Sequence, residues 1–213
     1  MNNFSYFLMI VIMLINFILI ASNNLRNCIK IVAFQGALNG LLSLFFPGEN
    51  LTLTTIIIST ITFLLKGLFF PMFLFYALKK VAIGKEIKHL IGYKTSLLIS
   101  LLALVLSFFL AYHLFAPSQI SFFIITASVF TTFIGLFIII SRVKAIMQVL
   151  GYLVLENGIA LFSFAFLIHQ PLLVEIGILL DVFVAVFVMG ITIFYINKEF
   201  DHINTHKLSQ LKD

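Results

Sequence analysis

The chain has 213 residues, of which 62% are hydrophobic and only 10% are charged, and its mean hydropathy is +1.18. A soluble globular domain carries about 25% charged residues, so this composition excludes a water-soluble fold and predicts a membrane protein with one domain, residues 1–213. The net charge of +5 is typical of basic loops beside a membrane rather than of nucleic-acid binding. Because Cys28 is the one cysteine, an internal disulfide and a multi-cysteine metal site are excluded.

Seven apolar stretches follow one another along the chain. A transmembrane helix needs about 20 predominantly apolar residues. The sequence provides such stretches at about 4–21, 29–46, 51–78, 95–115, 120–140, 146–168 and 172–196. The first residues, MNNFSYF, lack the basic region and cleavage site of a signal peptide, so the first stretch is expected to be retained. The sequence therefore predicts an all-α bundle of seven transmembrane helices.

Basic residues occupy alternate loops of this predicted bundle. They lie in or beside the first, third and fifth loops and in the C-terminal tail, whereas the second, fourth and sixth loops have none. These residues are Arg26, Lys30, Lys79, Lys80, Lys85, Lys88, Lys94, Arg142, Lys144, Lys198, Lys207 and Lys212. Since lysine and arginine favour the cytoplasmic side, we expect the N-terminus outside and the C-terminus inside.

Lys66, Glu156 and Asp181 each interrupt an apolar stretch near its middle. A charge at bilayer depth costs at least ~2.5–3.5 kcal/mol, so it is rarely present for packing alone. Lys66 lies about 19 Å from the inner end of its helix, and its side chain cannot reach the surface. Glu156 and Asp181 are predicted at similar depth on antiparallel neighbours. These residues could transfer protons, or they could be ion pairs that only lock the helices together.

Two further residues extend this pattern. Pro71, five residues after Lys66, is expected to bend its helix and to free a backbone carbonyl near the charge. Glu175 lies nearer the outer surface than Asp181. It is either the end of a proton path or a hydrated interfacial residue.

Small and amide-bearing residues mark expected helix contacts. In the second stretch, Gln35 and Asn39 are one turn apart beside Gly36 and Gly40, a small-xxx-small pattern that favours close helix packing. Asn16 in the first stretch has the same interpretation. The candidate packing positions are Gly36, Gly40, Gly151 and Asn157.

The sequence contains no recognisable catalytic motif. The patterns GxxxxGK[ST], GxGxxG, HExxH, CxxC and GxSxG do not occur. We therefore expect no cofactor, no metal and no catalytic centre in this chain.

The last two stretches carry a family resemblance. The segments QVLGYLVLENGIALF and LVEIGILLDVFVAVFVMGI resemble hydrogenase-4 component E, a membrane subunit of energy-converting nickel–iron hydrogenases and formate hydrogenlyase. Lys66 followed by Pro71 is similar to the same family. The positions that carry the pattern are Gln148, Gly151, Glu156, Asn157, Gly158, Glu175, Gly177, Asp181 and Ala185.

Residues 142–213, the last two stretches and the tail, also resemble the K subunit of complex I and the C subunit of multisubunit sodium/proton antiporters. Residues 1–141 form the preceding five helices. Gly151 and Asn157 match the glycine-to-asparagine spacing of the K subunit. That subunit has a glutamate where this chain has Leu153, and the acid here, Glu156, lies nearly one helical turn later.

The resemblance implies a non-catalytic, multi-pass subunit of an oxidoreductase in a bacterial cytoplasmic (inner) membrane. Its expected partners are antiporter-like membrane subunits and, in one reading, nickel–iron hydrogenase and iron–sulfur subunits. Its expected contribution is proton translocation through Lys66, Glu156, Asp181 and Glu175. Two alternatives remain: a subunit of a cation/proton antiporter or ion-coupled transport complex without hydrogenase, and a structural spacer.

Overall fold

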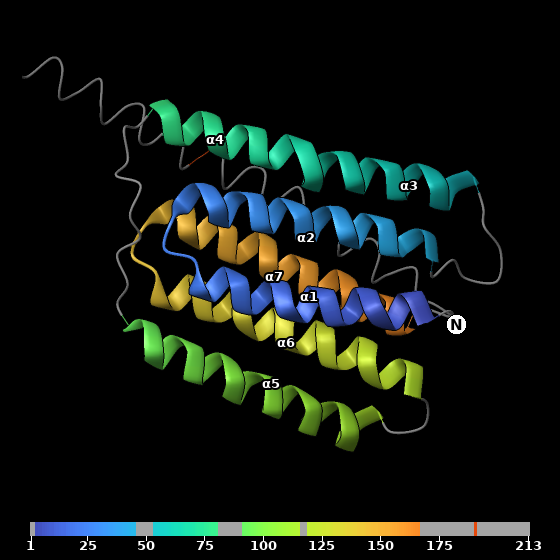
Figure 1. The fold of residues 1–213 in the computed structure, drawn as a ribbon. Coiled ribbons are helices and arrows are strands. Elements are labelled where there is room, and N and C mark those ends of the chain that lie inside the picture. The colour runs from blue at the N-terminus through green and yellow to red at the C-terminus, as the bar shows by residue number, and fades with distance from the viewer. Residues whose placement is uncertain (1–2, 46–52, 81–90, 116–118, 167–189, 191–213) are drawn as a thin grey trace, which may run out of the picture.

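The computed structural model describes residues 3–45, 53–80, 91–115, 119–166 and 190 (Figure 1). Within these ranges all regular elements are helices. They are α1 (Asn3–Ala21), α2 (Leu25–Phe45), α3 (Leu53–Leu64), the π-helix η1 (Leu65–Phe69), α4 (Phe70–Lys80), α5 (Tyr93–Phe115), α6 (Gln119–Ser141) and α7 (Ala145–Phe166). Because α3, η1 and α4 are continuous, they form the third predicted helix. Apart from Gly190, the predicted helix at 172–196 lies outside the described residues.

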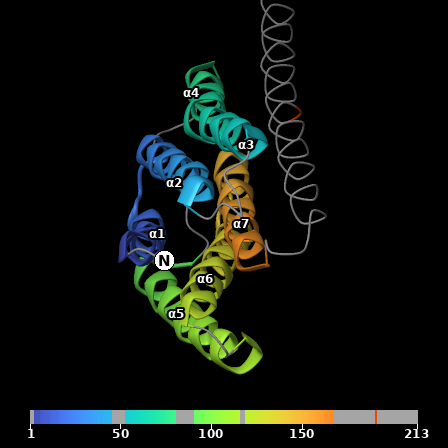
Figure 2. The same cartoon turned by 90° about the vertical axis from the view of Figure 1, so that its right-hand side faces the viewer.

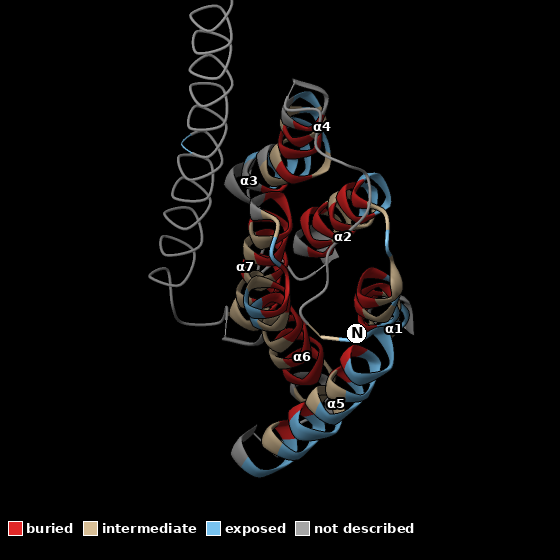
Figure 3. Cartoon of the chain, turned by 90° about the vertical axis from the view of Figure 1, so that its left-hand side faces the viewer, coloured by how far each residue is buried: buried red, intermediate tan, exposed pale blue. Residues whose placement is uncertain are grey.

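The helices lie lengthwise beside one another in a bundle. In Figure 1 the continuous α3–η1–α4 rod forms one edge, α5 forms the other, and α1, α2, α6 and α7 fill the space between them. The view turned by 90° keeps α3 and α4 beside α2, and α5 beside α6 (Figure 2). The fold thus places α6 and α7 at the centre, where Figure 3 shows the most extensive burial.

The interior is made of large aliphatic side chains, including Ile134 and Ile138 of α6 and Leu150 and Val154 of α7. Close helix packing is secured by glycine, because a Cβ atom on Gly135 would lie 2.6 Å from the Cα atom of Leu155. Backbones this near to each other are typical of membrane helix interfaces, where small residues allow close approach.

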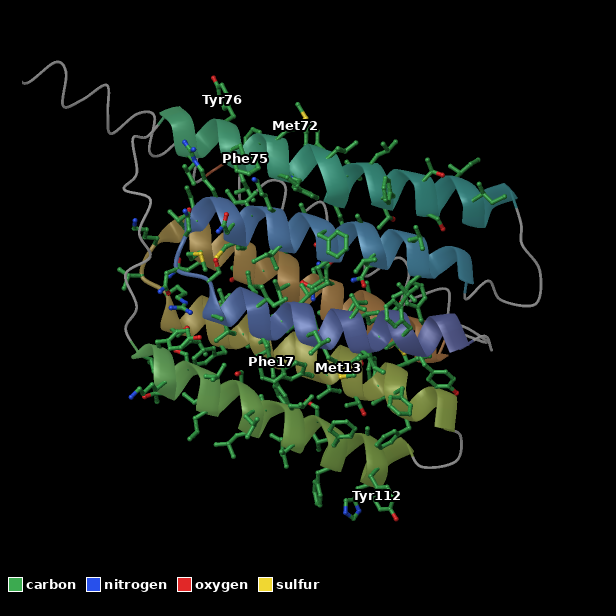
Figure 4. The ribbon with its side chains drawn as sticks, viewed as in Figure 1. Met13, Phe17, Met72, Phe75, Tyr76 and Tyr112 are labelled. Carbon is green, nitrogen blue, oxygen red and sulfur yellow. The ribbon has the colours of Figure 1, made fainter. Side chains whose placement is uncertain are left out.

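The outer surface is also apolar. Met72 and Tyr76 of α4 point away from the bundle, as does Tyr112 of α5, whereas Met13 and Phe17 face inward from α1 (Figure 4). Met72 is 70% exposed and Tyr112 is 66% exposed. An apolar surface of this extent is suited to lipid rather than to water.

Three helical segments are long and apolar enough to cross a membrane, at Tyr93–His113, Phe122–Ser141 and Ile146–Phe164. Their length and composition, together with the apolar outer surface, support a membrane protein.

Arg142 lies between α6 and α7 and is almost completely buried. Its Nη2 atom donates to the backbone oxygen of Ile20 over 3.4 Å, at the C-terminal end of α1, where carbonyl groups lack helical partners. Burial lowers the pKa of this guanidinium, and nearby Cys28 opposes that shift. The residue that the sequence assigns to a basic loop therefore also joins α1 to the α6–α7 connection.

Candidate functional site

Lys66 lies in a local widening of its helix. The backbone N–H group of Phe70 donates to the oxygen of Leu65, five residues earlier, which defines the π-helical turn. Pro71 has no N–H group, and its ring disfavours an ordinary α-helical turn around the carbonyl of Gly67. The π-helix thus ends just before Pro71, and π-helical turns often occur at functional sites; the bend expected at Pro71 stays a prediction.

A glycine on α2 brings Lys66 into the bundle. A Cβ atom on Gly36 would lie 2.7 Å from the Cβ atom of Lys66, closer than real Cβ atoms approach. One turn later, a Cβ atom on Gly40 would lie 2.9 Å from the Cα atom of Phe63. The backbones of α2 and of the α3–η1 rod are therefore in direct contact, and any side chain at these two positions would separate them.

The Lys66 ammonium forms an ion pair with the Glu156 carboxylate of α7. The side chain of Lys66 is 5% exposed and that of Glu156 is 2% exposed. Two charges this deep in an apolar bundle require mutual compensation, because each alone carries a desolvation penalty of several kcal/mol. The pair connects the π-helix at the edge of the bundle to its central helix.

An amide contact accompanies the ion pair. The Nδ2 atom of Asn39 donates to the backbone oxygen of Asn157 over 3.0 Å. Because Asn157 follows Glu156 and Asn39 lies one turn from Gly36, this bond joins α2 to α7 at the level of the charged residues.

A second polar chain runs from α2 through α1 to α6. Gln35 Nε2 donates to Asn16 Oδ1 over 3.1 Å, and Asn16 Nδ2 donates to Thr131 Oγ1 over 2.8 Å. The hydroxyl of Thr131 donates to the backbone oxygen of Ala127 over 2.7 Å. We call the eight residues of this region the polar layer: Asn16, Gln35, Gly36, Asn39, Lys66, Thr131, Glu156 and Asn157.

The structure brings together only part of the set selected from the sequence. Lys66 and Glu156 are paired, with Gly36 and Asn157 beside them. Gly151 packs elsewhere, against Ile139 of α6. Asp181 and Glu175 lie outside the described residues.

Thr131 was not selected from the sequence, although its hydroxyl links α6 to Asn16. Threonine is common in membrane helices, where its hydroxyl usually bonds only its own backbone, so no local signal distinguished this one. Asn16, by contrast, was recognisable as an isolated amide in an apolar stretch.

The polar layer can separate charge and hold protons, but it shows no binding site for a metal. Over the part of the chain that the structure describes, no group of three or more histidine, cysteine, aspartate or glutamate side chains could hold a metal ion.

Comparison with known proteins gives one distant similarity. The chain is 26% identical over 204 residues to an uncharacterised protein of Mycobacterium tuberculosis, Rv0085, and the match covers 95% of this chain and 93% of that protein. No family model matches the chain. No solved structure matches it either.

Proposed function

We propose that this chain is a non-catalytic integral membrane subunit of a hydrogenase-like or complex I-like oxidoreductase, in which Lys66, Glu156 and Asp181 take part in proton translocation. The observation that carries the proposal is the buried ion pair between Lys66 and Glu156. Ionisable residues inside a membrane bundle are expensive and mark ion or proton pathways.

The surroundings of the ion pair favour proton transfer over simple helix locking. Lys66 belongs to a π-helix, and hydrogen-bonded polar side chains of α2, α1 and α6 accompany the pair in the polar layer. A helix lock needs only two opposite charges, whereas proton movement also needs polar groups beyond the pair. Asp181, one helix further along the chain, would extend the series beyond the described residues.

The full topology is part of the proposal. Seven spans, with the N-terminus outside and the C-terminus inside the bacterial cytoplasmic membrane, follow from the apolar stretches and the alternating basic loops. In this orientation Glu175 lies near the outer end of the last span.

The proposed function depends on partner subunits. The resemblance to hydrogenase-4 component E and to the complex I K subunit favours neighbouring antiporter-like membrane subunits, with redox chemistry in other chains. A cation/proton antiporter-type or ion-coupled transport complex without hydrogenase uses the same buried charges, and so does a structural spacer. The first test therefore identifies the partners.

Purification of the tagged chain in mild detergent, followed by mass spectrometry, separates the first two readings. Co-purification of nickel–iron hydrogenase and iron–sulfur subunits supports the oxidoreductase. Antiporter-like subunits without a redox arm support the ion-transport complex.

Acid-to-amide variants separate proton transfer from the spacer role. Glu156→Gln and Asp181→Asn keep side-chain volume but remove the exchangeable carboxyl proton. We expect the complex to assemble while proton coupling, measured as pH change in vesicles, is lost. Ser163→Ala is the control on α7, because among the described residues the Ser163 hydroxyl bonds only the oxygen of Ala160 in its own helix. Loss of assembly together with retained coupling in any complex that still forms would favour the spacer.

A further inference from the structure

We propose that Gln35, Asn39 and Asn157 form an acceptor cradle that holds the Lys66 ammonium when the Glu156 carboxyl group carries a proton. The three residues are positioning residues for Lys66. The inference deepens the proposed function and rests on it, because it concerns the protonated state of the same ion pair.

The direction of the hydrogen bonds on α2 is fixed by a backbone carbonyl. The oxygen of Ala127 can only accept, so the Thr131 hydroxyl donates to it and in turn accepts from Asn16. The remaining oxygen of Asn16 accepts from the NH2 group of Gln35. This order leaves Gln35 Oε1 as an acceptor with no hydrogen-bond partner among the described residues.

The same argument applies to Asn39. Its NH2 group donates to the backbone oxygen of Asn157, which can only accept, so its Oδ1 atom is left as an acceptor. In the described part of the chain, neither Asn39 Oδ1 nor Asn157 Oδ1 has a hydrogen-bond partner, and both are buried. Buried acceptors without partners are uncommon and call for an explanation.

The three oxygens belong to residues that lie within one turn of Gly36 or directly after Glu156 in their helices. Gly36, where an added Cβ atom would clash with the Cβ atom of Lys66, lies between Gln35 and Asn39 on α2. Asn157 is adjacent to Glu156 and is bonded to Asn39. The acceptors thus come from the two helices, α2 and α7, that pack against Lys66 or pair with it.

A lysine ammonium is the donor that this arrangement suits. It carries three N–H donors, and amide oxygens can stabilise it without a negative charge. When Glu156 becomes neutral, the buried ammonium loses a counter-charge, a change that is strongly unfavourable unless other groups compensate. The cradle provides that compensation, so that Glu156 can exchange its proton while Lys66 keeps its charge.

Apart from Tyr152, the other ionisable groups of the described helices that pack here lie on the outer surface or toward the helix ends. Tyr152 is one turn before Glu156 on α7, and Tyr76 of α4 points outward (Figure 4). The remaining charged or titratable residues of the described helices that pack against Lys66 are at helix ends, namely Arg26, Cys28, Lys30, Lys79 and Lys80. Among the described residues, Glu156 is thus the acidic residue that can neutralise the Lys66 ammonium.

Solid-state nuclear magnetic resonance of the whole chain in lipid bilayers tests the cradle. The protein carries ¹⁵N-labelled lysine and ¹³C-labelled asparagine, glutamine and glutamate, so that contacts of Lys66 Nζ are read directly. In the native protein we expect a contact with the carboxyl carbon of Glu156. In Glu156→Gln we expect Lys66 to remain an ammonium and to gain a contact with the side-chain amide carbon of residue 35, 39 or 157.

The native protein at acidic pH provides the same readout without substitution and must show the same new contact. A neutral amine at Lys66, or an ammonium without contact to any of the three amides, would overturn the cradle. The cradle would also be refuted if the side-chain amide signals of residues 35, 39 and 157 shifted with sodium but not with choline. In that case the three oxygens would bind a metal cation instead of the Lys66 ammonium.

A second substitution measures the contribution of one acceptor. In the Glu156→Gln background, Asn39→Leu is expected to lower the pH at which half of Lys66 is protonated by about 1 unit, a tenfold change. Ser163→Ala in the same background is expected to leave this midpoint pH of Lys66 unchanged. If Asn39→Leu also left the midpoint pH unchanged, the result would count against the cradle. These measurements need no partner subunits, so the two proposals can fail separately. If Lys66 lacks the amide contacts while proton coupling is intact, only the cradle is refuted. If the contacts are present but proton coupling is absent, only the proposed function is refuted.

Discussion

Lys66 and Glu156 form an ion pair that joins the π-helix at one edge of the bundle to the central helix α7. The chain segments that carry them are far apart in sequence, and α2 lies beside both (Figure 1). The two residues are therefore coupled, and a substitution of either one is expected to affect the packing of η1, α2 and α7.

The first prediction concerns this pair as a unit. Lys66→Met and Glu156→Met each leave the opposite charge in an apolar interior, which typically costs about 3–5 kcal/mol. The double variant removes both charges at similar volume, so we expect its thermal midpoint to exceed that of either single variant. Thermal unfolding in detergent provides the measurement.

A double variant less stable than both single variants would show that the charges do not compensate each other. The control is the pair Lys94→Met and His113→Met, near opposite ends of α5 and about 28 Å apart, where we expect the effects to add within about 0.5 kcal/mol.

The second prediction concerns the contact between Gly36 and Lys66. In Gly36→Ala the new Cβ atom would lie 2.7 Å from the Cβ atom of Lys66, so the π-helix must move away from α2. Overpacking of this kind costs about 1–3 kcal/mol. We expect a lower thermal midpoint and a weaker interaction between residues 66 and 156 in a double-mutant cycle.

Gly92→Ala is the control for this substitution, because the nearest atom to its Cβ would be 4.0 Å away, at Thr95 Oγ1. Equal thermal midpoints for Gly36→Ala and Gly92→Ala would refute the close contact.

Much of the helical plan could be predicted from hydrophobicity alone. The apolar stretches at 95–115 and 120–140 correspond closely to α5 and α6, because a helix that faces lipid must be apolar along its whole length. Such uniform stretches, however, carry no information about which face of a helix meets which neighbour.

The candidate site could be predicted only in part. Lys66 and Glu156 were conspicuous because charges are costly in lipid, but their pairing depends on packing between distant segments that one sequence does not contain. The π-helix was not predicted, since Pro71 indicates a disturbed helix without specifying the form of that disturbance. Thr131 gave no signal at all, because its role arises from Asn16 on another helix.

The third prediction concerns Pro71. In Pro71→Ala the restored N–H group can bond the oxygen of Gly67, and we expect the π-helical turn to tighten toward α-helix. Loss of the extra residue in the turn would rotate Lys66 relative to α4 by up to about 100°. The coupling energy between residues 66 and 156, about 0.5–3 kcal/mol for contacting residues, should then fall.

The cycle of Lys66→Met and Glu156→Met, repeated in the Pro71→Ala background, measures this change. An undiminished coupling energy would show that the π-helix persists without the proline. Leu74→Ala serves as a comparison on α4, since it removes buried volume and restores no N–H group.

The fourth prediction concerns the hydroxyl of Thr131. Thr131→Val keeps the shape of the side chain but removes the acceptor of the Asn16 NH2 group, which leaves a buried donor unsatisfied at a cost of about 1–3 kcal/mol. Thr126 offers a matched control on the same helix, because within the described ranges its buried hydroxyl bonds only the oxygen of Phe122 in its own helix. We expect Thr126→Val to lower the thermal midpoint less than Thr131→Val does, and Thr131→Ser to restore most of the loss. If the two valine variants were equally stable, the chain from Gln35 through Asn16 to α6 would contribute nothing to the fold, and the order of donors that leaves Gln35 Oε1 as an acceptor would no longer be fixed by Thr131.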